Sequence, residues 1–292
     1  MSAATHPVGV IGVGLVGLAL VERLRAARIR VVGWDIDPAR REALVAAHGV
    51  AAASAADVFA ACDNVLLTLF DGAQTSAVIR AALPGLKAGM RLVDCATSDP
   101  EQAVALAVRL AARGVRILDA PLSGSSQQIR DGTAVMMIGG NAEDCDALEP
   151  ILNAISTRRF LLGPPGSGSR AKLATNLLLG LNRAALAESL VFAEGLGLDL
   201  HTFLNLVRVT PAYSRAVDAK GAQMIEGTFA PPQSRVQQHR KDLHLIIEAA
   251  ARSGHTLPLA ATHAAILDAA IAQGAGDLDN AAIIDTLRQW RR

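Results

Sequence analysis

The sequence predicts an α/β protein in which an N-terminal doubly wound parallel sheet is followed by an all-helical C-terminal domain. Short apolar runs alternate with helical patterns between Val8 and Leu162. A rigid Gly-Pro-Pro-Gly break follows at Gly163–Gly166, and every later segment has a helical period. We therefore expect two domains, a sheet-containing domain at residues 1–163 and an all-helical domain at residues 164–292.

Composition limits the class of protein. A chain of 292 residues that is 51% hydrophobic can bury two moderate cores. A net charge of +1 argues against nucleic acid or an anionic membrane as the main partner. The three cysteines show no metal-ligand spacing and fit a reducing compartment. Because residues 1–7 lack a basic signal-peptide region and the next apolar run is too short to span a bilayer, we expect a cytoplasmic protein.

The first strand leads directly into a glycine turn. An apolar run at Val8–Ile11 precedes the G-x-G-x-x-G sequence of Gly12, Gly14 and Gly17, and a helical pattern follows. In that context Gly12 makes the tight turn, Gly14 lets the backbone approach a pyrophosphate, and Gly17 lets the helix pack on the strand. This arrangement predicts a Rossmann-type dinucleotide site with the phosphates at the helix N-terminus.

The residue that ends the second predicted strand indicates which dinucleotide is bound. It covers Ile29–Trp34 and ends at Asp35, about twenty residues beyond the glycines, where a carboxylate can accept hydrogen bonds from the ribose hydroxyls. Asp35 would repel a 2′-phosphate and therefore favours NAD. Arg40 and Arg41 are able to bind such a phosphate, although the capping pair Asp37-Pro38 also places them on an exposed helix. We expect NAD, with NADP possible.

The alternation then continues to the end of the first domain. We predict strands at 64–69, 91–95, 115–119, 134–138 and 159–162, and helices at 75–83, 101–113 and 142–155. Ligands of such sheets bind beyond the carboxyl ends of the strands. Three places there are candidates for ligand contact: Leu69 with the residues after it, Thr97, and the loop after Asp119.

Two of these candidates have simpler explanations. Thr97 is as readily the N-cap of the helix that follows it. Ser123 and Gly124, with the flanking backbone N–H groups, are able to hold a carboxylate, but a Ser- and Gly-rich stretch is also typical of a surface turn.

A long helix from Gly166 to about Glu194 begins the second domain. It carries Lys172 and Asn176 at a spacing of four residues, which places them on one face. A solvated lysine beside an asparagine is the simple interpretation. Further helices are predicted at 199–209, 211–225, 237–251, 257–273 and 280–290, the last capped by Asp279. Lys241 lies in the helix predicted at 237–251, where an exposed charge on an amphipathic helix is the simple interpretation.

Together these motifs make the chain resemble the β-hydroxyacid dehydrogenase family over almost its whole length. Ala96, Leu122, Thr175 and Ser125 depart from the family pattern. The matching residues are Gly12, Gly14 and Gly17 in the glycine turn, Asp94, Thr97 and Pro100 in D-x-S-T-x-x-P, Asp119 to Gly124 in D-A-P-V-S-G-G, Gly166, Gly168, Lys172 and Asn176 in G-x-G-x-x-x-K-x-x-N-N, and Lys241 and Asp242 in the K-D pair.

The resemblance implies an NAD(P)-dependent transfer of hydride between a nicotinamide and a small 3-hydroxy acid. Lys172 is then the general acid/base, because desolvation and a neighbouring cation lower the pKa of a lysine toward neutrality. Asn176 orients the substrate, and Ser123 with Gly124 binds its carboxylate. Lys241 adds positive charge for substrate and cofactor, and Gly12, Gly14, Gly17, Asp35, Leu69 and Thr97 bind the cofactor.

Three other functions are compatible with parts of the sequence. An imine reductase can share the two-domain arrangement but requires a different proton donor. Ser169 and Lys172 form the S-x-x-K pair of serine acylases, whose companion motifs are missing. A silent NAD-binding module would leave Lys172 and Asn176 unexplained. The apolar second half also predicts a homodimer or homotetramer, and Ser125 adds a hydroxyl that can serve a polar substrate.

Overall fold

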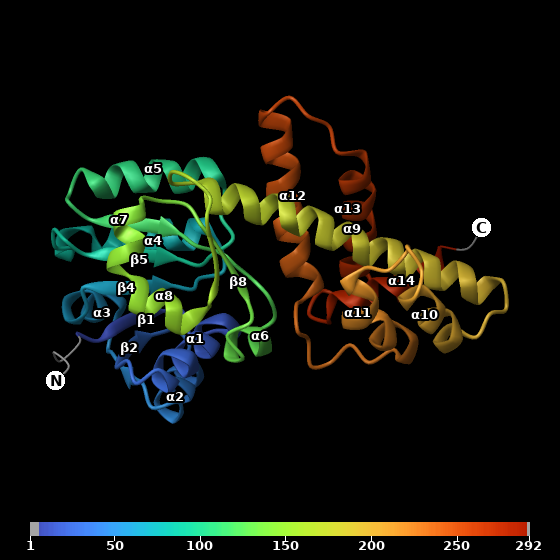
Figure 1. Cartoon of the computed structure of the whole chain (residues 1–292), viewed down its shortest axis with the longest axis horizontal. Helices are drawn as coiled ribbons and strands as arrows, with labels where there is room; N and C mark the ends of the chain where they lie inside the picture. Colours follow the sequence, from blue (N-terminus) through green and yellow to red (C-terminus); the bar gives the residue numbers. More distant parts are fainter. Residues whose placement is uncertain (1–5, 291–292) are drawn as a thin grey trace. The chain divides into compact units, whose positions relative to one another are not determined.

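The computed structural model describes residues 6–290 (Figure 1). The chain forms two compact units, residues 1–172 and residues 173–292. Residues 1–5, on which part of the signal-peptide expectation depends, lie outside the described residues. The domain boundary expected at residues 163/164 stays a prediction. A single long helix begins in the first unit and continues into the second.

The first unit contains a parallel sheet with the strand order β3-β2-β1-β4-β5-β6. The order reverses between β1 and β4, which is the topological switch point of a doubly wound sheet. Its strands are β1 (Val8–Ile11), β2 (Val31–Trp34), β3 (Val50–Ala51), β4 (Asn64–Leu67), β5 (Arg91–Asp94) and β6 (Arg116–Asp119). The predicted doubly wound parallel sheet is confirmed.

Both faces of this sheet are buried, as the apolar runs predict. Along β1, Val8 and Val10 pack into a core with α1, whereas Ile11 packs into a second core on the other face, with α3, α4 and α5 (Figure 1). The helices are α1 (Leu15–Ala26), α2 (Pro38–Ala46), α3 (Ala55–Ala61), α4 (Gly72–Ala82) and α5 (Pro100–Ala111). Two elements were not predicted: β3, which has two exposed residues, and α3, whose N-cap Ser54 accepts a hydrogen bond from the Asp57 amide.

A second, smaller sheet follows, with the order β7-β8-β9. The strand β7 is antiparallel to β8, and β8 is parallel to β9. The elements are β7 (Leu122–Ser123), α6 (Ser126–Arg130), β8 (Val135–Ile138), α7 (Ala142–Ala147), α8 (Glu149–Ile155) and β9 (Arg158–Leu161). The single helix predicted for residues 142–155 is wrong: it divides at Leu148, because Pro150 is accommodated only in the first turn of a new helix.

The long helix α9 runs from Ser167 to Gly195. Gly166, with a φ of 91°, turns the chain into it. A Cβ atom at Gly168 would lie 2.4 Å from the Asp119 carbonyl oxygen and 2.5 Å from that of Met137. Glycine therefore allows the start of α9 to touch the ends of β6 and β8. The predicted helix is confirmed, and Gly180 does not interrupt it.

The second unit consists of helices packed on the later part of α9. Asp279 caps the last helical segment, as predicted, by accepting a hydrogen bond from the Ala281 amide at 3.0 Å. That segment opens with a 3₁₀ turn, Asn280–Ala282. The α-helices are α10 (Leu200–Arg208), α11 (Arg215–Glu226), α12 (Val236–Arg252), α13 (Pro258–Ala272) and α14 (Ile283–Gln289). Between residues 6 and 290 no helix has the length and apolar character needed to cross a membrane.

Candidate active site

The glycine turn lies between β1 and α1, at the switch point of the sheet. A Cβ atom at Gly17 would lie 2.0 Å from the Gly12 carbonyl oxygen, so α1 packs directly on the turn. At Gly12, where φ is 90°, a Cβ atom would lie 2.7 Å from the Thr68 carbonyl oxygen. The Thr68 hydroxyl in turn donates a hydrogen bond to the Gly12 carbonyl. The turn is therefore fixed from β4 as well as from its own sequence.

Gly14 has a different environment. A Cβ atom there would meet only an Arg40 nitrogen, at 3.8 Å. The protein therefore has room for a side chain at Gly14, and the glycine leaves the backbone open to a ligand. This is the cradle that a dinucleotide pyrophosphate requires.

We expect Gly17→Ala and Gly14→Ala to separate these two functions. Gly17→Ala should lower the melting temperature and the yield of folded protein, because its methyl group would overlap backbone. Gly14→Ala should fold normally and weaken cofactor binding by about tenfold or more, since only the close approach of the pyrophosphate is lost. Thermal melts and cofactor titrations of both variants test this. Equal melting temperatures for the two variants would contradict it.

Asp35 follows β2 and lies beside the same turn. It is 4% exposed. One carboxylate oxygen accepts a hydrogen bond from the Val13 amide at 2.6 Å and the other from the Asp37 amide at 2.9 Å. Arg40 approaches it at 3.4 Å, and Arg41 donates to the Asp35 backbone carbonyl at 2.6 Å. The Arg41 guanidinium is therefore already hydrogen-bonded to the backbone.

Leu69 and Thr97 lie in the loops after β4 and β5. A Cβ atom at Gly12 would be 3.1 Å from the end of the Leu69 side chain, so Leu69 borders the glycine turn. The alternative that Thr97 is the N-cap of α5 is wrong. Asp99 is the N-cap and accepts a hydrogen bond from the Glu101 amide at 2.8 Å.

The loop after β6 carries Ser123 and Gly124. Ser123 belongs to β7 and pairs with Val135. Within residues 6–290 its hydroxyl makes no hydrogen bond, and Gly124 adopts a φ of 153°. The adjacent Ser125 is occupied: its hydroxyl accepts from the Gln128 amide at 3.2 Å, and the Gln128 carboxamide oxygen accepts from the Ser125 amide at 2.8 Å. This reciprocal capping box starts α6.

The expectation that the Ser125 hydroxyl serves a polar substrate stays a prediction, because the cap uses this oxygen only as an acceptor. In this structure that hydroxyl caps a helix.

Lys172 is the last residue of the first unit and lies in the second turn of α9. It is 9% exposed, so the simple interpretation of a solvated lysine is wrong. Its Nζ donates a hydrogen bond to the Leu122 carbonyl oxygen at 2.7 Å. The structure thus brings the ammonium group to the strand that carries Ser123.

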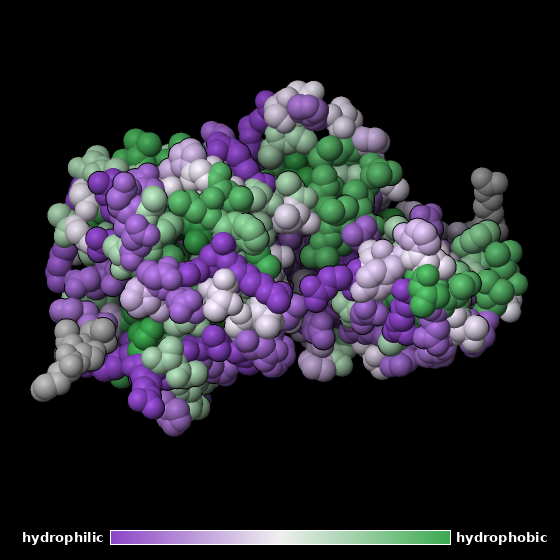
Figure 2. Space-filling model, in the orientation of Figure 1, coloured by the Kyte–Doolittle hydropathy of each residue, from purple (hydrophilic) through white to green (hydrophobic). Residues whose placement is uncertain are grey.

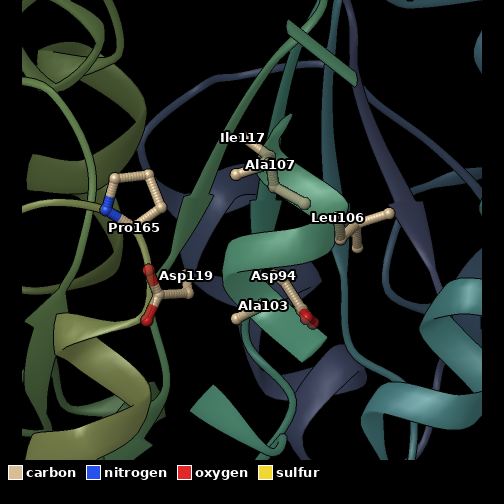
Figure 3. A pocket seen from close by; sticks show the side chains of 7 residues that line it. All are labelled: Asp94, Ala103, Leu106, Ala107, Ile117, Asp119 and Pro165. Carbon is tan, nitrogen blue, oxygen red and sulfur yellow. The ribbon is translucent and has the colours of Figure 1, made fainter. Parts of the chain in front are cut away.

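Two buried carboxyl groups end the neighbouring strands β5 and β6. Asp94 and Asp119 are paired in register and border a cavity of about 10 Å³, together with Pro165 (Figure 3). A cavity of this size holds no more than one water molecule. Burial raises the pKa of Asp94 from 3.8 to about 7, although hydrogen bonds from the Ala96 amide and the Thr75 hydroxyl oppose this. Burial also raises the pKa of Asp119.

The pKa of Asp94 predicts a pH-dependent stability. Because the folded state keeps this proton up to about pH 7, the stabilisation is complete at low pH. It is lost as the pH rises from about 4 to about 7, where only the unfolded state has released the proton. Asn mimics the protonated acid, so Asp94→Asn should raise the melting temperature at pH 8 by about 2 to 4 °C or more and leave it nearly unchanged at pH 4. The exposed Asp277→Asn is the control. A gain that is equal at both pH values would contradict the prediction.

The second unit contains the other predicted residues. Asn176 is 5% exposed and donates a hydrogen bond to the Asp242 carboxylate at 3.0 Å. The Lys241 ammonium lies 3.0 Å from the same carboxyl group. Because the Asn176 amide nitrogen is held by Asp242, its carbonyl oxygen has a fixed direction. Lys241 is thus paired with its neighbour and is not simple exposed charge on an amphipathic helix.

Three residues that hold predicted residues in place were not themselves predicted to be functional. Thr68, Asp119 and Asp242 each hold a predicted residue or its helix in place. The sequence marked Asp119 and Asp242 only as members of matching motifs. No sequence pattern identified Thr68, because its hydrogen-bond partner Gly12 lies more than fifty positions away in the chain.

The comparisons with known proteins agree with this geometry. Residues 7–163 match the family described as the NAD binding domain of 6-phosphogluconate dehydrogenase. Residues 166–287 match the family described as the NAD-binding of NADP-dependent 3-hydroxyisobutyrate dehydrogenase.

Individual relatives cover nearly the full chain. An L-threonate dehydrogenase from Cupriavidus necator is 32% identical and covers 94% of each chain. A 2-(hydroxymethyl)glutarate dehydrogenase from Eubacterium barkeri is 30% identical over 97% of this chain and 95% of its own. The crystal structure of a 3-hydroxyisobutyrate dehydrogenase from Salmonella typhimurium has a TM-score of 0.88 at 27% identity, covering 96% of this chain and 99% of its own.

Imine reductases are more distant. One from Pseudomonas sp. has a TM-score of 0.65 at 21% identity, over 97% of this chain and 99% of its own, and this is a likeness of fold alone.

The family matches cover both parts of the chain, and they are consistent with the glycine turn and with the buried carboxylate after β2. The chain belongs to the β-hydroxyacid dehydrogenases, which are NAD(P)-dependent oxidoreductases.

Proposed function

We propose that this protein transfers a hydride between NAD and a small, polar 3-hydroxy acid, with Lys172 as the general acid/base. The observation that carries the proposal is the buried Lys172 ammonium, which lies 2.7 Å from the Leu122 carbonyl, one residue before Ser123. A hydroxyl, a glycine backbone and an ammonium group on adjoining elements suit a substrate that has a carboxylate and a hydroxyl.

Each proposed residue then has one task. Bound nicotinamide supplies or accepts the hydride. In oxidation, neutral Lys172 takes the proton of the substrate hydroxyl, and in reduction its ammonium form returns it. Ser123 and Gly124 bind the substrate carboxylate. Asn176, one helical turn beyond Lys172, orients the substrate, and Lys241 contributes positive charge for substrate and cofactor.

The cofactor residues favour NAD. Asp35 presents a buried carboxylate beside the glycine turn, where a 2′-phosphate would be repelled. Arg41, one of the two cations able to attract that phosphate, is held by the backbone carbonyls of Asp35 and Ile36. Leu69 and Thr97 would contact the cofactor from the loops after β4 and β5.

Two other functions are disfavoured by particular residues. A serine acylase would need an accessible Ser169, but this residue is 1% exposed and its amide is bonded to Asp119. An imine reductase would have no use for the carboxylate-binding loop of Ser123 and Gly124.

A substrate panel tests the proposal. Four-carbon and five-carbon 3-hydroxy acids and their decarboxylated alcohols are supplied separately with NAD and NADP, a cyclic imine is supplied separately with NADH and NADPH, and absorbance at 340 nm is followed. We expect turnover of 3-hydroxy acids, a preference for NAD, and little turnover of the alcohols. Turnover of the imine alone would reject the proposal.

We further propose a cytoplasmic homodimer or homotetramer without a nucleic-acid partner. The surface of the second unit carries exposed apolar side chains on α9, α10 and the residues after them (Figure 2). They include Phe192, Leu196, Leu198, Leu206 and Val209. Covering such a surface with a second copy is the simple solution for an apolar patch. Light scattering after size exclusion chromatography tests the assembly, and a monomer would contradict it.

A further inference from the structure

Asp119 holds the start of α9 against the sheet. Its carboxylate lies at the end of β6, where one oxygen accepts a hydrogen bond from the Gly166 amide at 2.8 Å and the other from the Ser169 amide at 2.7 Å. Amides at a helix start have no partner within the helix, and a carboxylate there is also favoured by the helix dipole. Both carboxylate oxygens are therefore occupied, one by an amide in the first turn of α9 and the other by the amide of the residue that precedes α9.

The same helix turn leads directly to Lys172. Lys172 follows Ser169 by three residues and so lies on the same face of α9. Its Nζ is bonded to the carbonyl of Leu122, which follows Asp119 by three residues. These contacts connect three elements. Asp119 at the end of β6 is bonded to the start of α9, and the Lys172 ammonium group on α9 is bonded to β7, the strand that follows β6. A shift of the first turn of α9 would move Lys172 relative to Ser123.

Close packing leaves no room for such a shift. A Cβ atom at Gly139 would lie 2.3 Å from an Asp119 carboxylate oxygen and 2.8 Å from the amide nitrogens of Ser167 and Gly168. Gly139 is itself bonded to the backbone of Asp119 in both directions, at 2.8 and 3.0 Å. A methyl group at Gly139 would therefore displace the start of α9 without altering any group proposed to touch the substrate.

We propose that Asp119 is a positioning residue that sets the place of the Lys172 ammonium group, an inference that depends on the proposed role of Lys172. Asp119 is 5% exposed and both of its oxygens are occupied, so it acts through the helix and not on the substrate. Displacing a reacting group by about 1 Å can reduce turnover by about a hundredfold. The effect of losing Asp119 should therefore appear in kcat and not in cofactor binding.

Two variants and their combination test this. Asp119→Asn replaces one accepting oxygen with a donor that faces an amide, and Gly139→Ala pushes on the same contact. Each should lower kcat by about ten- to a hundredfold and leave the Kd for NAD within about threefold. Because both act by one route, the double variant should be no slower than the worse single variant. The matched control is Asp199→Asn, which changes the N-cap carboxylate of α10, a helix with no proposed site residue.

A pH profile separates positioning from simple loss of structure. Partial unfolding lowers kcat in proportion to the folded fraction, which a thermal melt at each pH measures, whereas a displaced Lys172 meets different surroundings and should change the pH dependence of kcat in the folded protein. In Asp119→Asn we expect the pH at which kcat reaches half of its maximum to move by at least about half a unit. Normal kcat, a profile of unchanged shape, or strictly multiplicative losses in the double variant would each overturn the proposal. If Lys172→Ala keeps normal turnover, the proposed function itself fails. If that variant is inactive while Asp119→Asn is normal, only this inference fails.

Discussion

Lys172→Ala is expected to lower kcat by at least about a hundredfold, and by as much as about ten thousandfold, while the Kd for NAD stays within a few fold of the wild-type value. General acid/base groups contribute to rate by this order. The residues proposed to bind the cofactor lie in the glycine turn and in the loops after β4 and β5, so truncating Lys172 should leave them intact. Steady-state kinetics and a titration of NAD by fluorescence measure the two quantities.

Two further variants sharpen this result. Lys172→Arg keeps the positive charge, but a guanidinium cannot release its proton at ordinary pH. It should therefore be nearly as slow as the alanine variant if Lys172 moves a proton, and nearly normal if only its charge matters. Lys87→Ala removes an exposed lysine of the same unit and should have normal kcat. Near-normal turnover of Lys172→Ala would remove Lys172 from the mechanism.

Asp279→Asn is expected to lower the free energy of unfolding by about 3 to 5 kcal/mol, because it leaves the Lys220 ammonium buried without its counter-charge. Lys220 and Asp279 lie 2.7 Å apart and are 7% and 0% exposed in their side chains. Asp279 also accepts hydrogen bonds from the amides of Gln233, Ser234 and Ala281. The pair thus joins α11, the segment before α12 and the last helical segment.

Denaturant titration of the full chain measures this loss. Asp277→Asn, two residues away and 82% exposed in its side chain, is the matched control and should be neutral. Adding Lys220→Met to Asp279→Asn should recover part of the lost stability, since the unpaired charge is then removed as well. A loss below about 1 kcal/mol in Asp279→Asn would show that the pair is not a principal support of the helical unit.

The departures from the predicted elements have identifiable physical causes. Pro150 divides the helix predicted for residues 142–155, since its ring and missing N–H exclude it from a helix interior. The strand β7 has only two residues and depends on pairing with β8, so its own sequence gave no sign of it. Ser125 stands where the family motif has glycine, and its hydroxyl oxygen caps α6 by accepting a hydrogen bond from the amide of Gln128, three residues later.

The sequence by itself determined the parts of this protein that depend on local order along the chain. The glycine turn, Asp35 after its strand and the spacing of Lys172 and Asn176 follow from periods and short motifs, because each concerns neighbours on one element. Only the tertiary structure decided which distant groups meet: Thr68 with Gly12, Asp119 with the start of α9, and Asn176 with Asp242. These contacts join residues that lie fifty or more positions apart, and their partners are chosen by packing, burial and hydrogen-bond satisfaction, which no local pattern contains.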